Sequence, residues 1–162
     1  MSERFPGKYM GIVVDNDDPK HLSRIRVRVP EVFGEETIGW CLPCSPYSGA
    51  AVGLAAVPPV DSLVFVEWPA GDVTRTPIWS GGMWVGGEGV EGAGPDVLIL
   101  VTPGGNKVTL HDASGSEAIE IEAPSGAKVS LDSEGLRMEF GSQKIDVSRS
   151  SVSINGGALE VR

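Results

Sequence analysis

The stretch that decides the fold is residues 107–140, which reads KVTLHDASGSEAIEIEAPSGAKVSLDSEGLRMEF. Apolar residues recur in it as alternating pairs or triplets, and turn-forming residues separate one group from the next. The first pairs are Val108/Leu110, Ile119/Ile121 and Val129/Leu131. Alternation with a period of two is typical of β-strands that bury one face. The stretch therefore predicts a meander of short strands.

The same pattern continues to the end of the chain as a degenerate repeat, with groups that begin at positions 108, 119, 129, 136, 145, 152 and 159. Each strand offers only two or three apolar side chains, and no helix is expected to cover them. In a monomer this face would stay in water, which is an aggregation hazard. Identical chains are the simplest cover, because each copy carries the same unfilled face.

We therefore expect residues 96–162 to form an intertwined trimeric β-helix, a β-prism in which the apolar member of every pair points at the axis. Polar residues of the same strands are expected to coat the outside. The expected trimer core is Val108, Leu110, Ile119, Ile121, Val129, Leu131, Leu136, Met138, Phe140, Ile145, Val147, Val152, Ile154, Leu159 and Val161.

Residues 1–85 predict a separate small β domain, and residues 86–95 form a glycine-rich connector. Five short strands are expected, at residues 8–15, 24–29, 37–45, 62–68 and 76–85. Five short strands, one long Gly/Ala/Pro-rich connection and no strong helix favour a five-stranded OB barrel. The predicted fold class of the whole chain is thus all-β.

Composition excludes several classes of protein. The 22 glycines and 12 prolines among 162 residues interrupt the chain too often for long helices. The net charge of −9 repels phosphate backbones, so no nucleic-acid partner is expected. The longest apolar stretch is far shorter than the roughly 20 residues that span a bilayer, and the first residues lack the apolar segment of a secretion signal.

Two motifs raise the question of chemistry. Trp40-Cys41-Leu42-Pro43-Cys44 has the spacing of thiol redox enzymes, which would make a redox enzyme a third class of function. The residues after Cys44 are a poor helix start, so we expect Trp40, Leu42 and Cys44 to share one face of a barrel strand. The only histidines, His21 and His111, are not spaced as metal ligands are. A metal could bind only if three copies of His111 met on a symmetry axis. No catalytic residue, metal site or cofactor is predicted.

Arg24, Arg26 and Arg28 occupy one face of an alternating strand, and OB barrels often bind single strands. No aromatic residues interleave with these arginines, so we expect them to pair with carboxylates. An OB-fold binding module for single-stranded nucleic acid or a carbohydrate is the alternative function.

An ordered series of motifs resembles the phage baseplate spike proteins, a family that includes baseplate assembly protein V and the valine-glycine repeat proteins of type VI secretion. The motifs are Gly11–Pro19, Ser23–Pro30, Ser45–Gly49, Pro58–Trp68, Gly71-Asp72, Thr76–Gly82, Thr102–Asn106, Pro124–Gly126 and Leu131–Gly135. The resemblance implies a homotrimeric central spike at the tip of a contractile tail, phage or tail-derived injection particle, which helps to puncture the target envelope.

The resemblance also implies partners and a location. The barrel would dock to tail hub and baseplate proteins, with the inner tube an indirect partner and the target membrane a transient one. The protein would assemble in the cytoplasm and become part of a phage tail or of an extracellular or cell-associated contractile injection particle. No lysozyme-like insertion separates the two parts, so no enzyme activity is implied.

The last residues depart from spikes that end in their own iron-binding apex, because they lack the histidine pair of those spikes. The comparison with the family therefore implies a blunt end that carries a separate tip protein of the proline-alanine-alanine-arginine (PAAR-like) repeat type. The expected contacts with the tip protein are Gly156, Gly157, Ala158, Leu159 and Val161.

Overall fold

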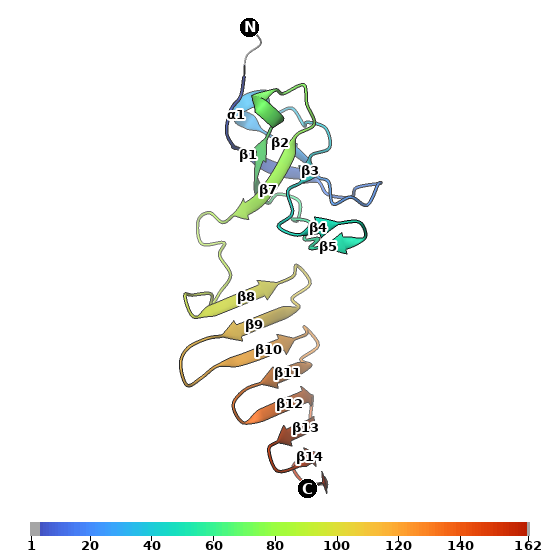
Figure 1. Ribbon diagram of the computed structural model, residues 1–162, viewed down its shortest axis with the longest axis vertical. Helices are drawn as coiled ribbons and strands as arrows, with labels where there is room; N and C mark the ends of the chain where they lie inside the picture. The colour runs from blue at the N-terminus through green and yellow to red at the C-terminus, as the bar shows by residue number, and fades with distance from the viewer. Residues whose placement is uncertain (1–3, 162) are drawn as a thin grey trace. The chain divides into compact units, whose positions relative to one another are not determined.

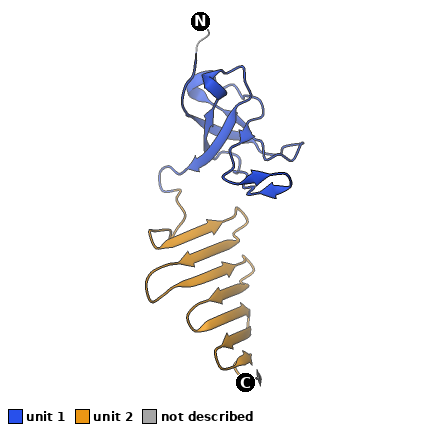
Figure 2. Cartoon of the chain, in the orientation of Figure 1, with its two compact units in different colours: residues 1–87 blue, residues 88–162 orange. Residues whose placement is uncertain are grey.

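The computed structural model describes the backbone of residues 4–161 and the side chains of residues 4–159. The chain divides into two compact units, residues 1–87 and residues 88–162 (Figure 2). Nearly all the regular structure is β, with one α-helical turn and one 3-10 turn in the first unit (Figure 1). Within the described range, neither of these short turns is long and apolar enough to cross a membrane.

The first unit is built on a curled five-stranded sheet with the order β2-β1-β6-β7-β3. Its strands are β1 (Tyr9–Asp15), β2 (Arg26–Arg28), β3 (Leu42–Pro43), β6 (Leu63–Glu67) and β7 (Ile78–Met83). All neighbours pair antiparallel except β3, which runs parallel to β7. Isolated bridges Ile25↔Cys41 and Arg28↔Thr37 tie the β2 side to the segment that leads into β3.

The core of the first unit lies inside the curl of this sheet. Alternation turns Ile25, Val27 and Val29 inward, and all three are fully buried. They pack with Val13, Cys41, Val64, Val66, Trp68 and Trp79. Since burying an aliphatic side chain contributes about 1.5–3 kcal/mol, this cluster is sufficient to hold a small sheet together.

Two local features of the first unit differ from the expected strands. The expected strand at residues 37–45 is regular only at β3, and the following segment forms a separate hairpin of β4 (Ser48–Gly49) and β5 (Val52–Gly53). A helical turn α1 (Pro30–Phe33) and a 3-10 turn η1 (Pro69–Gly71) each begin at a proline. Proline fits the first turn of a helix, because its missing N–H has no partner to lose there.

The second unit is one eight-stranded antiparallel meander, in which each strand pairs only with its neighbours in sequence (Figure 1). The strands are β8 (Val97–Val101), β9 (Lys107–His111), β10 (Ala118–Glu122), β11 (Lys128–Leu131), β12 (Gly135–Phe140), β13 (Gln143–Ser148), β14 (Val152–Ile154) and β15 (Leu159–Val161). Successive strands leave no gap for a strand of another copy. An arrangement that interleaves different chains strand by strand within one sheet therefore does not fit this unit.

One glycine in the meander is required by close packing of the backbone. Gly135 has a φ of +147°, and a Cβ at this position would lie 2.0 Å from the carbonyl oxygen of Val147. A side chain there would force β12 away from β13, because backbone atoms cannot yield as a flexible side chain can. Glycine is therefore the residue that fits at the start of β12.

Candidate functional site

Two columns of apolar side chains run down one face of the eight-stranded sheet. Cross-strand register defines them, because residues directly opposite each other on paired strands lie on the same face. The first column is Leu98, Leu110, Ile119, Leu131, Leu136, Val147 and Val152, and the second is Leu100, Val108, Ile121, Val129, Met138, Ile145, Ile154 and Leu159. We call this surface, together with Phe140, the apolar face.

The apolar face is open to solvent in the single chain. Leu98, Phe140 and Ile121 are 61%, 60% and 48% exposed. The fully buried hydrophobic side chains all lie in the first unit, and none is found among the described residues of the second. A groove of about 590 Å³ follows the apolar face between Leu100 and Ile154. The sheet is thus regular but has no hydrophobic core of its own.

The structure places the side chains expected at the trimer core on this one face, except that the side chain of Val161 lies outside the described residues. It adds Leu98 and Leu100, which sequence reasoning missed. Residues 97–101 read VLILV, so the alternation that marks the other strands is hidden in a continuous apolar run. The signal that would have found them is the length of the run, since five apolar residues suit a strand.

The opposite face of the sheet carries charge in a regular order. One column alternates in sign down five successive strands: Lys107, Glu122, Lys128, Glu139 and Lys144. Lys128 Nζ lies 2.7 Å from Glu120 Oε1, and Arg137 Nε lies 2.8 Å from Asp146 Oδ1. Exposed pairs of this kind contribute about 0–1 kcal/mol each, so they mark a surface suited to water rather than a source of stability.

The pKa values of this outer face follow from its ion pairs. The Lys128 ammonium donates a hydrogen bond to Glu120 and lowers the pKa of that carboxyl, while the carboxylate raises the pKa of Lys128. Arg137 in the same way lowers the pKa of Asp146. These carboxylates stay charged at neutral pH, so the two faces of the sheet differ sharply in polarity.

A buried carboxylate organises the loop between β1 and β2 in the first unit. Asp18 is only 6% exposed, and its oxygens accept hydrogen bonds from the backbone amides of Lys20, Leu22 and Arg24. The Arg24 guanidinium also donates to Asp18 and lies over the Trp40 ring, with 5.1 Å from Cζ to the ring centroid. The hydrogen bond from Arg24 holds the pKa of Asp18 well below its ordinary value.

The three arginines of the β2 segment pair with carboxylates, which confirms the prediction made for them. Besides the Asp18–Arg24 pair, Arg26 Nη1 lies 4.0 Å from Asp15 Oδ2 and Arg28 Nη1 lies 2.8 Å from Glu35 Oε2. Because each arginine already has an acidic neighbour, this strand offers little net positive charge to a phosphate backbone.

We expected Trp40, Leu42 and Cys44 to share one face of a barrel strand, but Leu42 and Cys44 are exposed and Cys44 is not part of the core. Cys41 is the buried cysteine, because its backbone exchanges hydrogen bonds with Ile25 across the bridge and its side chain enters the core. Burial raises the pKa of the Cys41 thiol to about 12, whereas a redox nucleophile needs a lowered pKa. Both cysteines are free thiols.

Neither histidine has the neighbours of a metal ligand. His21 and His111 belong to different units, and His111 Nε2 lies 3.8 Å from Glu120 Oε2. In the part of the chain that the structure describes, no group of three or more His, Cys, Asp or Glu residues is placed to hold a metal ion.

The residues expected to contact a tip protein lie around the last turn. Gly156, Gly157 and Ala158 form the exposed turn between β14 and β15, and Leu159 opens β15. Leu159 also belongs to the second apolar column, so the proposed trimer and a tip protein would both use it. Contact between these residues and a tip protein stays a prediction.

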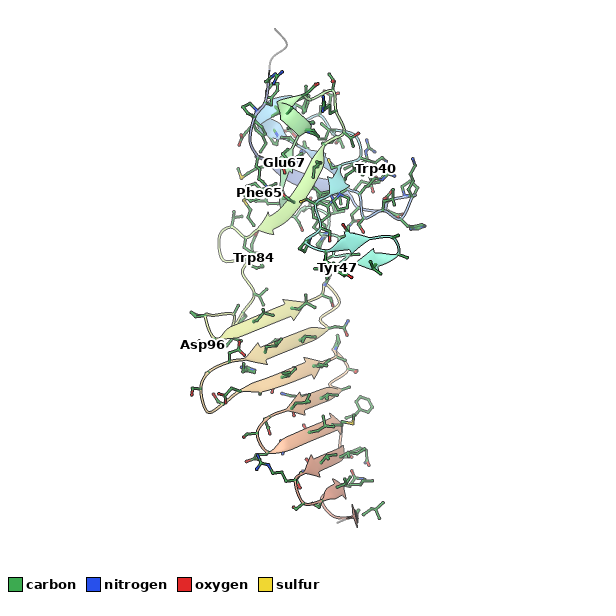
Figure 3. The ribbon with its side chains drawn as sticks, in the orientation of Figure 1. Trp40, Tyr47, Phe65, Glu67, Trp84 and Asp96 are labelled. Atoms are coloured by element: carbon green, nitrogen blue, oxygen red, sulfur yellow. The ribbon has the colours of Figure 1, made fainter. Side chains whose placement is uncertain are left out.

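A second apolar surface lies on the β4–β5 hairpin of the first unit, where Figure 3 labels Tyr47. Tyr47, Val52 and Leu54 are each more than half exposed, at 63%, 55% and 57%. Residues 42–60 contain no charged side chain. The sequence predicted a long connection after the expected strand at residues 37–45, and the exposed apolar surface was not predicted.

Comparison with known protein families matches both units. Residues 9–84 match the model of the type VI secretion system/phage-baseplate injector OB domain, and residues 97–160 match that of the phage baseplate V C-terminal trimerisation domain. No curated protein matched the chain. The second match supports self-association as a homotrimer, which agrees with a sheet that has one uncovered apolar face. From these two matches in order along the chain, we conclude that it belongs to the phage baseplate spike family.

Proposed function

We propose that this protein is the central spike of a contractile tail or tail-like injection machine, a non-enzymatic part that helps to puncture the target envelope. Residues 96–162 would form the spike, residues 86–95 a connector and residues 1–85 the hub-docking domain. The observation that carries the proposal is the apolar face, which needs cover that the described part of the chain does not supply.

In the proposed trimer each copy supplies one wall of a three-walled prism. The side chains of the apolar face are about half exposed, so each gains about 1 kcal/mol on full burial. About fifteen such positions give on the order of 15 kcal/mol per chain. This gain equals the upper end of the roughly 4–15 kcal/mol that an association step costs. The gain from three chains therefore favours a stable trimer.

The meander also suits a part that carries axial load. Ladder hydrogen bonds of antiparallel strands run perpendicular to the strands. With the prism axis along the direction in which the strands stack, these bonds lie along the load, and every layer contributes three sets of them. The mechanism we propose is stiffness, because no single wall can detach without exposing the apolar face of the other two.

The two units would then meet different partners. The uncharged β4–β5 hairpin, with Tyr47, Val52 and Leu54 exposed, is a surface suited to the tail hub or baseplate. The turn Gly156–Ala158 with Leu159 and Val161 would carry the PAAR-like tip protein. The inner tube would be an indirect partner, and the target membrane a transient one.

Mass in solution tests the central claim. Light scattering should give about three times the chain mass of 17.0 kDa. A stable monomer at micromolar concentration would contradict the spike proposal. Purified tail particles give the second readout, because labelled protein should appear at the centre of the baseplate. For the tip, Ala158→Asp should abolish retention of a PAAR-like protein while the trimer mass stays unchanged.

A further inference from the structure

The turns that join the strands lie along two opposite sides of the eight-stranded sheet. These two sides, here called edges, differ in charge. The turns at one edge, 102–106, 123–127, 141–142 and 155–158, contain no charged residue and are rich in glycine. We call it the glycine edge. The turns at the other edge, 112–117, 132–134 and 149–151, carry Asp112, Glu117, Asp132, Glu134 and Arg149. We call it the acidic edge.

The column of alternating charge on the outer face runs beside the glycine edge, and its lysines alternate with Glu122 and Glu139. Lys107 begins β9 and Lys128 begins β11, each directly after a turn of the glycine edge. The same strands end at the acidic edge, where Asp112 follows β9 and Asp132 follows β11. Two strands of the wall therefore carry a positive charge at one end and a negative charge at the other.

These opposite charges cannot meet within one chain. Lys107 and Asp112 are separated by the whole of β9, about 17 Å at 3.4 Å per residue. Among the residues that the structure describes, neither takes part in a side-chain ion pair. The amide of Asp112 donates a hydrogen bond to the carbonyl of Asp96, so two acidic residues share this corner of the sheet, where Figure 3 labels Asp96. A cation from another copy would find two acidic side chains at this corner.

The trimer proposed above brings the two edges together, and the inference rests on it. Three-fold symmetry is a head-to-tail arrangement, in which each copy joins one edge to the opposite edge of the next copy. Rotation about the prism axis does not shift a strand along that axis, so the three copies of each strand lie at the same height. The lysine end of β9 in one copy therefore meets the aspartate end of β9 in the next.

We propose that Lys107 of each copy pairs with Asp112 of the next copy, and that the three equivalent pairs close the corners of the prism. The small turns of the glycine edge leave the lysine side chain free to cross the corner. Lys128 and Asp132 repeat the arrangement at β11, although Lys128 already contacts Glu120 and Glu122 within its own chain. The pairs fix which edges meet and at which level.

A charge-reversal cycle on the full chain tests the pairing. Lys107→Glu and Asp112→Lys should each speed dissociation of the trimer about tenfold at low salt, which corresponds to about 1.4 kcal/mol over three corners. The double variant restores all three pairs with reversed polarity and should return to within about twofold of the parent. At 1 M salt, where screening acts within about 3 Å, the differences should largely disappear.

The matched control combines Lys107→Glu with Glu134→Lys, since Glu134 lies on the same edge but at a lower level. This double variant should show no rescue. The pairing would be wrong if the effects of the two single changes on trimer dissociation simply added in the Lys107/Asp112 double variant. With a trimeric parent, the spike proposal would still stand. A monomeric parent chain would overturn both.

Discussion

Val129→Asp tests the inward orientation of the apolar face most sharply. Val129 lies in the second apolar column between Ile121 and Met138 on the neighbouring strands. In the trimer the change removes about 2 kcal/mol of hydrophobic transfer per copy and buries a carboxylate at several kcal/mol. Three copies at one level together cost on the order of 15 kcal/mol, and each 1.4 kcal/mol is a factor of ten in an equilibrium constant. We therefore expect loss of the trimer.

Ser130→Asp is the matched control, because Ser130 is the next residue of β11 and lies on the outer face between Glu120 and Arg137. It adds the same charge to the same strand at a similarly half-buried position, but on the face that carries the ion pairs. Size-exclusion chromatography with light scattering should show a trimer for Ser130→Asp and none for Val129→Asp. A trimer of parental stability for Val129→Asp, or equal loss in both variants, would refute the orientation.

Other positions give independent tests. The lowered pKa of Asp18 adds stability that is complete above its ordinary value of 3.8 and is lost as pH falls below it, so urea midpoints of Asp18→Asn should be lower at pH 7 and depend less on acid pH. Gly135→Ala should cost at least about 2 kcal/mol in denaturant titrations, against about 1 kcal/mol for Gly126→Ala, whose added methyl group meets open space. Leu100→Ser should lower the melting temperature of the trimer, whereas Val101→Ser, on the other face of β8, should leave it within a degree or two.

The sequence predicted the second unit well because its pattern is local. Alternation and turn residues settle both the strands and the face, and the register follows once the hairpin turns are short. The pattern failed at Leu98 and Leu100, where both faces of β8 are apolar and the period of two disappears. It also does not say whether neighbouring strands come from one chain or from several.

The first unit was harder to predict, because its less regular segments depend on distant partners. Ile25 and Cys41 pair across the curled sheet, and this bridge decides that Cys41 rather than Cys44 is buried. The loop held by Asp18 depends on Arg24 in the same way. The alternation of Ile25, Val27 and Val29 could be predicted, since these residues lie within β2 and directly beside its two ends.

The strictly sequential pairing of β8 to β15 has a consequence for how the protein is made. Hairpins close in about 1–10 μs, whereas encounters between chains at cellular concentrations take far longer. Each newly synthesised copy can therefore begin to pair its strands while still alone, but its apolar face stays exposed until it meets two other copies. The yield of correctly assembled particles then depends on the relative rates of trimerisation and aggregation. Slow synthesis or a chaperone that binds the apolar face would favour trimerisation.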